Sequence, residues 1–233
     1  LDDAGEPQGN GVPDLVDRFG GRWAVFVADD VSLGSGFEGT AATGGGDLVR
    51  NGVVSPAADI GNAYLYGTRD GAGNPVVFMA LERLSGADGS VEFEIDQATV
   101  RLGHGGYGQG APWKVNGARA ADDLLVRVIF SGGAVAGAEL LRWNEGAWDL
   151  IAAVTGEGCD AAELICSLSN REPIAAGPWP SYDTSGDPDS IGAGRFVELG
   201  VNVGALLGSH PVAQSIRVRT PEDIAFGYVV EGN

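Results

Sequence analysis

The sequence is poor in the residues and motifs that most often carry out catalysis. Among 233 residues there are 2 histidines, 2 cysteines and a single lysine, Lys114. No G-x-S-x-G, H-E-x-x-H or Walker motif occurs in the chain. These absences disfavour α/β-hydrolases, zinc proteases and P-loop nucleotide hydrolases, because each of those classes depends on one of these motifs. We therefore expect a protein that is not an enzyme.

Long apolar runs and basic residues are also scarce. No apolar run approaches the roughly 20 residues that a membrane-spanning helix needs, so we expect no membrane insertion of this segment. Acidic residues outnumber basic ones by 32 to 14, which gives a net charge of -18. Such a charge repels the phosphates of nucleic acids and the headgroups of anionic membranes, and it favours divalent cations as partners.

The two cysteines lie close together in an irregular stretch of sequence. Cys159 and Cys166 are separated by six residues, and we predict a loop disulfide between them. The alternative is a pair of reduced thiols. A zinc site is disfavoured because neither His104 nor His210 is near in sequence. A disulfide would place the protein in an oxidising compartment, outside the cell or on its surface.

What the chain does have is a recurring alternation of apolar and polar residues. The stretch 90–96 shows it best, with Val91, Phe93 and Ile95 on one face of a predicted strand. We expect this face to be buried and the opposite, acidic face to be exposed to solvent. The residues of that acidic face are Glu92, Glu94 and Asp96.

About eleven such runs predict an all-β protein. Tight turns between them, such as Asn144-Glu145-Gly146, favour antiparallel pairing. We expect one antiparallel β-sandwich domain, jelly-roll-like, over residues 22–233, with two long loops at 103–121 and 155–194 and one helical turn at Val203–Leu207. The predicted strands are Trp23–Ala28, Ala63–Thr68, Pro75–Arg83, Ser90–Gln97, Thr99–Leu102, Leu124–Ser131, Ala138–Trp143, Trp148–Val154, Arg195–Val201, Gln214–Arg219 and Ile224–Val230.

A polar N-terminal arm, residues 1–21, contains oxygen-bearing residues at the spacing of a calcium loop. Gly11 stands at the sixth position, where such loops turn sharply. The run from Asn10 to Asp17 resembles the calcium repeats of thrombospondin type 3, although Glu6 and Gln8 replace the aspartates of that family. The alternative is a polar arm in which Asp14 caps a turn. The predicted ligands are Glu6, Gln8, Asn10, Val12, Asp14 and Asp17.

The long loops contain candidate residues for ligand binding. Trp113 and Trp179 could stack on sugar rings, as aromatic faces do in carbohydrate-binding modules. Asp183, Asp187 and Asp189 form a second oxygen-rich loop, for which simple turns that the aspartates cap are the favoured interpretation.

One segment invites comparison with an enzyme family. Glu94-Ile95-Asp96 resembles the start of the catalytic signature of β-jelly-roll glucanases, in which paired carboxylates cleave a glycosidic bond. The family continues to a second glutamate, but this chain continues Gln97-Ala98-Thr99 and lacks that acid/base. A solvated strand face is therefore the favoured interpretation.

Taken over residues 20–230, the chain resembles a family of uncharacterised exported domains found near the N-termini of large bacterial cell-surface proteins, notably in actinobacteria. The likeness rests on the cysteine-bearing stretch and on G-N-A-Y-L-Y at 61–66, A-L-E-R-L-S at 80–85, V-E-F-E at 91–94, D-D-L-L-V at 122–126, L-R-W at 141–143 and V-R-T-P-E-D at 218–223. The resemblance implies a surface-displayed β-sandwich.

These observations predict a non-enzymatic extracellular or cell-surface domain for structure or adhesion, stabilised by calcium and by a disulfide. Its expected partners are other surface-protein domains, glycans or copies of itself, including a filament in which the arm pairs with a neighbour's sheet edge. A carbohydrate-binding module is the first alternative, and a glycoside hydrolase that uses carboxylates is the second.

Overall fold

The structure is a computed structural model that describes part of the chain. Side chains are described for most of the residues in 60–98, 118–175, 190–208 and 216–218. In the described ranges no helix has the length and apolar character that crossing a membrane requires. The backbone is described for residues 24–28, 37–38, 46–50, 60–98, 101–104, 113–116, 118–175, 190–208, 215–220 and 224–228.

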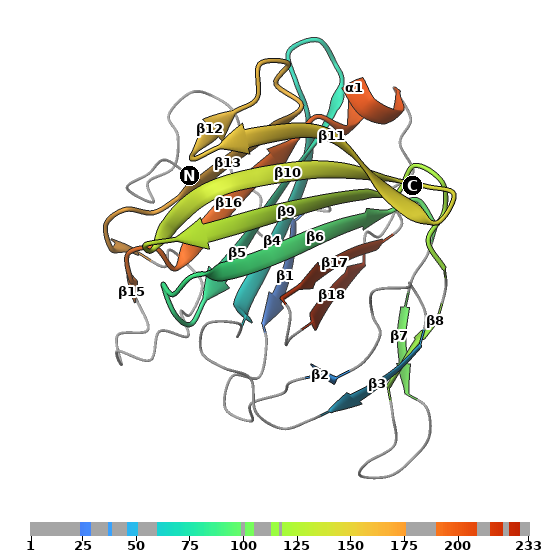
Figure 1. The fold of residues 1–233 in the computed structure, drawn as a ribbon, viewed down its shortest axis with the longest axis horizontal. Coiled ribbons are helices and arrows are strands. Elements are labelled where there is room, and N and C mark those ends of the chain that lie inside the picture. The colour runs from blue at the N-terminus through green and yellow to red at the C-terminus, as the bar shows by residue number, and fades with distance from the viewer. Residues whose placement is uncertain are drawn as a thin grey trace.

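Two six-stranded antiparallel sheets face each other as the layers of a sandwich (Figure 1). The first sheet has the strand order β1-β4-β5-β16-β13-β12. Its strands are β1 (Ala24–Ala28), β4 (Ile60–Arg69), β5 (Pro75–Arg83), β12 (Gly158–Cys159), β13 (Ile165–Ser169) and β16 (Phe196–Val201).

The second sheet has the order β11-β10-β9-β6-β17-β18 and lies in front in Figure 1. The chain passes between the layers after β5, after β11 and after β16, which is typical of a sandwich rather than of a simple meander. The strands of the second sheet are β6 (Gly89–Asp96), β9 (Leu124–Ser131), β10 (Ala134–Asn144), β11 (Ala147–Thr155), β17 (Ser215–Arg219) and β18 (Ile224–Tyr228).

Two smaller sheets and one short helix complete the described elements. A four-stranded sheet has the order β2-β3-β8-β7, and β14 pairs with β15. The helix α1 spans Val203–Leu207, as predicted, and the Asn202 side chain caps it by accepting the N–H of Ala205. The strands are β2 (Phe37–Glu38), β3 (Gly46–Arg50), β7 (Arg101–His104), β8 (Trp113–Asn116), β14 (Ile174–Ala175) and β15 (Ser190–Ile191).

The prediction of an all-β antiparallel sandwich is confirmed. A strand lies at each of the eleven predicted positions, and β5 and β9 have the predicted bounds. The hairpin between β10 and β11 turns through Glu145 and Gly146, whose φ angles are both positive, at 46° and 101°. This is the geometry of a two-residue turn that matches the twist of the flanking strands, and glycine adopts it without strain.

The core lies between the two large sheets and follows the predicted alternation. Val91, Phe93 and Ile95 of β6 point into it and are at most 1% exposed. Burying a side chain of this size contributes about 2 kcal/mol. Partners from the other strands are Leu65, Met79, Leu81, Val126, Val128, Leu140, Ile165, Val197, Leu199, Val201, Ile216 and Val218.

The interval 155–194, predicted as a long loop, contains strands that the sequence pattern missed. The most important is β13, which pairs with β16 and places Ile165 in the core. The inward residues that follow, Ser167 and Ser169, are polar although each is only 2% exposed, while the apolar Leu168 faces outward. The pattern of this strand is therefore inverted, which is why periodicity did not identify it. In the interval 103–121 the structure has β8.

Candidate functional site

The acidic face of β6 is buried, which corrects the prediction that it is exposed to solvent. Glu94 and Asp96 are 0% exposed, and only Glu92 keeps partial contact with water. The alternation of faces along the strand is nevertheless as predicted. The error arose because arginines from distant parts of the chain cover this face and neutralise its carboxylates.

The first of these arginines is Arg217, on the neighbouring strand β17. Its Nε and Nη2 donate to the two oxygens of Asp96 at 3.0 and 2.6 Å, and Nη2 also lies 2.6 Å from Glu94 Oε1. Burial lowers the pKa of Arg217, but the hydrogen bond to Asp96 and the charge of Glu94 outweigh that effect and raise it overall. Arg217 therefore stays charged inside the protein.

The second arginine, Arg119, lies in the segment that leads into β9. Its Nε and Nη2 donate to the two oxygens of Glu94 at 2.5 and 3.0 Å. Its guanidinium carbon lies 5.1 Å from the ring centres of both Trp143 and Trp148. Because those rings cover the cation, Arg119 is held between an aromatic pair and a carboxylate, with its side chain only 1% exposed.

The two tryptophans face each other across the β10–β11 hairpin. Trp143 and Trp148 are register partners, and their rings meet edge to face with centres 5.2 Å apart. This pair lies one position away from the two-residue turn. It is of the non-hydrogen-bonded kind, in which the facing Cα atoms are closest and the side chains interact most strongly. The aromatic pair lies on the outer face of the sheet, partly exposed, outside the core between the layers.

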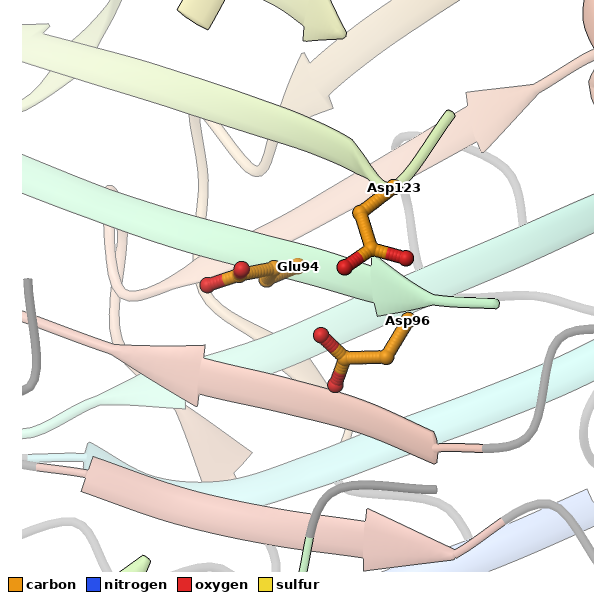
Figure 2. Close-up of side chains that lie close together, drawn as sticks. All are labelled: Glu94, Asp96 and Asp123. Carbon is orange, nitrogen blue, oxygen red and sulfur yellow. The ribbon is translucent and has the colours of Figure 1, made fainter. Parts of the chain in front are cut away.

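A third carboxylate, Asp123, points at the same place from the end of the segment before β9 (Figure 2). Its Oδ1 accepts the backbone N–H of Gln97 at 2.6 Å, and its Oδ2 accepts that of Ala120 at 2.8 Å. Asp123 thus joins the residue that follows β6 to the segment that precedes β9. Its backbone carbonyl also accepts the N–H of Trp143.

The surroundings of Asp123 disfavour its charged form. Burial raises the pKa of the Asp123 carboxyl to about 6, and the negative charges of Asp96 and Glu94 add to the rise. The two backbone hydrogen bonds act in the opposite direction but do not cancel it. Asp123 therefore takes up a proton more readily than an aspartate in water does.

The three carboxylates are also close enough together to hold a metal ion. One oxygen from each of Glu94, Asp96 and Asp123 lies within 4.8 Å of the others. In the structure, however, guanidinium groups of Arg119 and Arg217 already donate to Glu94 and Asp96. A cation would have to displace these arginines, so the donor set is occupied by the protein itself and fits a metal poorly.

A second, partly exposed ion-pair group follows on the same face. Arg127 of β9 lies opposite Glu92 of β6 and Glu139 of β10, and it donates to them at 2.9 and 3.1 Å. Acids and arginines thus alternate across three adjacent strands. The group differs from the buried cluster in its access to water, since the Arg127 side chain is 37% exposed.

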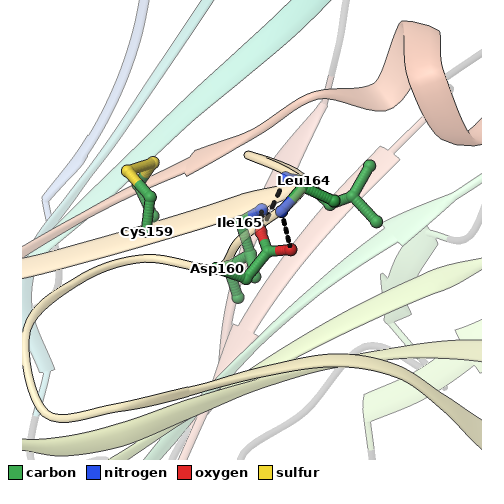
Figure 3. Close-up of a disulfide and its surroundings, with 6 residues drawn as sticks. Cys159, Asp160, Leu164 and Ile165 are labelled. Carbon is green, nitrogen blue, oxygen red and sulfur yellow. Dashed lines mark hydrogen bonds between the residues drawn. A yellow bond between two sulfur atoms is a disulfide. The ribbon is translucent and has the colours of Figure 1, made fainter.

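The predicted disulfide is present, but it joins two paired strands rather than the ends of an irregular loop. Cys159 of β12 and Cys166 of β13 are direct register partners at the edge of the first sheet. Asp160 closes the turn between them, because its Oδ1 accepts the N–H groups of Leu164 and Ile165 at 2.7 and 2.9 Å (Figure 3).

The other predicted site residues are not brought together by the described structure. Trp113 begins β8, but its side chain is outside the described part. The remaining calcium and ligand candidates fall wholly outside the described residues and stay predictions. They are Glu6, Gln8, Asn10, Val12, Asp14, Asp17, Trp179, Asp183, Asp187 and Asp189.

The arginines and Asp123 were missed as members of a site. One signal for Arg217 was available, because it alternates with the apolar residues Ile216 and Val218 in a predicted strand. A strand with arginine on its polar face is a suitable neighbour for a strand with acids on that face. Pairing of the two strands was not apparent, since Arg217 and Asp96 are 121 residues apart. Nothing in the sequence marked Arg119.

Comparison of the chain with protein-family models, curated proteins and solved structures gives no significant match.

Proposed function

We propose that this protein is a non-catalytic structural or adhesive domain of an exported or cell-surface protein. The observation that carries the proposal is the buried cluster of Glu94, Asp96, Asp123, Arg119 and Arg217. In it the carboxylates that would be the best candidates for glycoside cleavage are bonded to arginines and backbone amides and are closed to solvent. Carboxylates so placed hold three parts of one sheet together.

Two further observations support an extracellular setting. Both cysteines of the chain are joined in a disulfide, a bond that persists in oxidising compartments. The net charge of -18 keeps such a domain soluble and repels nucleic acids, which fits a protein that functions outside the cell. Copies of the chain, other surface domains and glycans are its proposed partners.

The experiment that tests the non-catalytic role compares the wild type with Glu94→Gln and Asp96→Asn. We expect none of the three proteins to release sugar from a panel of chromogenic glycosides and β-glucans, and we expect both variants to unfold at lower urea concentration. Hydrolysis by the wild type that Glu94→Gln abolishes would instead establish the glycoside hydrolase alternative. The adhesive role is tested by capture of soluble protein on beads that carry the same protein or an immobilised glycan.

A carbohydrate-binding module is the second candidate, and the partly exposed Trp143–Trp148 pair favours it. The two rings are partly exposed on the outer face of the sheet, and apolar ring surfaces of this kind can stack on sugar rings. Binding on a glycan array that Trp148→Ala abolishes, and that Leu168→Ala on the other sheet leaves intact, would support this candidate. Trp113→Ala and Trp179→Ala test the loop residues in the same way.

Calcium binding by the N-terminal arm is a separate proposal. Calorimetry should show heat of calcium binding in the wild type and none in Asp14→Ala, because Asp14 supplies one of the proposed ligands. The absence of heat in both proteins would refute the site.

A further inference from the structure

Counted over the described residues, the buried cluster does not balance its charges when every acid is ionised. Glu94, Asp96 and Asp123 carry three negative charges, whereas Arg119 and Arg217 carry two positive ones. All three carboxylates are 0% exposed, and the two arginine side chains are each 1% exposed. Water therefore cannot stabilise the remaining charge, and an unpaired charge in such surroundings is strongly unfavourable.

We propose that the cluster binds one proton, held on the Asp123 carboxyl, and that it thereby makes the junction of β6, β17 and the segment before β9 sensitive to pH. With the proton, two negative charges face two positive ones. Without it, one negative charge of the cluster has no counterpart among the described residues. The device is independent of whether the domain is adhesive or structural.

The contacts of the three acids show why Asp123 carries the proton. The oxygens of Glu94 and Asp96 accept charge-assisted hydrogen bonds from guanidinium groups. Those of Asp123 accept from backbone N–H groups, which are neutral donors. Burial is the main cause that raises the Asp123 pKa to about 6.

Charged groups face Asp123 from each described element around it. Glu94 and Asp96 face it from β6, and Arg217 faces it from β17. Within its own segment, Arg119 is bonded to Glu94, while Arg142 of β10 lies 3.7 Å from the exposed Asp122. The positive groups that the structure describes around Asp123 are thus engaged with other acids.

The direction of the pH effect follows from the sign of the shift. A carboxyl whose pKa is about 6 in the folded protein and near 3.8 when unfolded binds its proton more tightly in the folded state. The resulting stabilisation is complete below the unfolded value and is lost as the pH rises through the folded value. Between pH 5 and 7.5 this group alone should raise the unfolding equilibrium constant about tenfold.

The test is an NMR titration that follows the two backbone amides whose N–H groups donate to Asp123. We expect the amide signals of Gln97 and Ala120 to shift together between pH 4.5 and 8 with a midpoint near pH 6. The amides of Leu164 and Ile165 are the control, since they donate to Asp160, whose pKa is lowered, and they should stay constant in this range. Flat titrations at Gln97 and Ala120 would overturn the proposal.

A pair of variants tests the same point through stability. The unfolding equilibrium constant would be measured in urea at pH 5 and at pH 7.5. Asp123→Asn should remove the tenfold difference between the two pH values, whereas Asp122→Asn, at the exposed neighbouring position, should keep that difference. An unchanged pH dependence in Asp123→Asn would contradict the proposal. If that variant does not fold, the wild-type titration decides alone. Repeating it with millimolar calcium distinguishes the alternative, because calcium-induced shifts of these two amides at neutral pH would mean that a cation, rather than a proton, balances the charge.

Discussion

Arg217 of β17 pairs in register with Glu94 of β6 but directs two of its N–H groups to Asp96, which lies two residues further along β6. A single guanidinium therefore binds two of the three acids of β6 that the alternation had placed on the outer face. All three side chains are buried, so this contact lies in the part of the outer face that is closed to water.

Replacement of Arg217 should destabilise the protein severely. Arg217→Met leaves the buried charges of Asp96 and Glu94 partly uncompensated, and we expect a loss of about 3–5 kcal/mol in the free energy of unfolding. Arg127→Met is the matched control, because Arg127 lies on the same face with similar partners but is 37% exposed, and it should cost less than about 1 kcal/mol. Equal losses in urea unfolding would show that burial does not govern these ion pairs.

Asn170 should be among the least replaceable polar residues of the fold. It is 3% exposed, and its Nδ2 donates to the carbonyls of Glu172 and Gly192 at 2.9 Å, while its Oδ1 accepts the N–H of Phe196 at 2.9 Å. Asn170→Ala leaves these groups unsatisfied, for which we expect a loss of about 3 kcal/mol.

The isosteric variant Asn170→Asp is the informative companion. A carboxylate keeps the shape but turns a donor into an acceptor that faces carbonyl oxygens, so we expect it to be at least as damaging as alanine. Thermal unfolding measures both variants. An aspartate that preserves wild-type stability would mean that shape rather than hydrogen bonding defines this position.

Gly194 should not accept a side chain. Its φ is +71°, and a Cβ atom there would lie 2.1 Å from the carbonyl oxygen of Gly133. Gly132 has a similar φ of +64°, but a Cβ atom there would have no atom within 4 Å. A substitution at Gly132 therefore reports the cost of backbone strain without a steric clash. We expect Gly132→Ala to cost about 1 kcal/mol and Gly194→Ala to cost clearly more, by chemical denaturation. The reverse order would contradict the close approach of the two turns.

The disulfide should contribute to stability without shaping its own turn. It closes a short loop, so the Cys159→Ser/Cys166→Ser double variant should lose about 2 kcal/mol. Asp160 continues to bind the amides of Leu164 and Ile165, and their hydrogen exchange should stay slow relative to the global change. Asp160→Ala, with the disulfide intact, should speed exchange at both amides. Fast exchange in the double variant alone would assign the turn to the disulfide instead.

The sequence pattern predicted the faces of the strands but not what covers them. Alternation along 91–95 identified the inward residues because a strand's own geometry determines the period. The burial of Glu94 depends on Arg119 and Arg217, which lie 25 residues after it and on the paired strand β17, so no local window contains the information. Strand β13 was missed for another reason, since its buried face carries Ser167 and Ser169.

The disulfide shows the intermediate case between these two. The spacing of Cys159 and Cys166 was enough to predict the bond, because short loops between cysteines close readily. The strand pairing that aligns the two cysteines depends on β16, which binds the other edge of β13, and this was not visible in the spacing.

Chemical labelling of carboxyl groups tests most directly the claim that the acids of β6 are closed to solvent and bound by arginine. Native protein would be treated with a carbodiimide and an amine, and the modified acids would be read by mass spectrometry. The account predicts rapid labelling of the exposed Asp122 and Asp149 and no labelling of Glu94, Asp96 or Asp123 until the protein unfolds. Labelling of Glu94 in the native protein at the rate of Asp122 would contradict it.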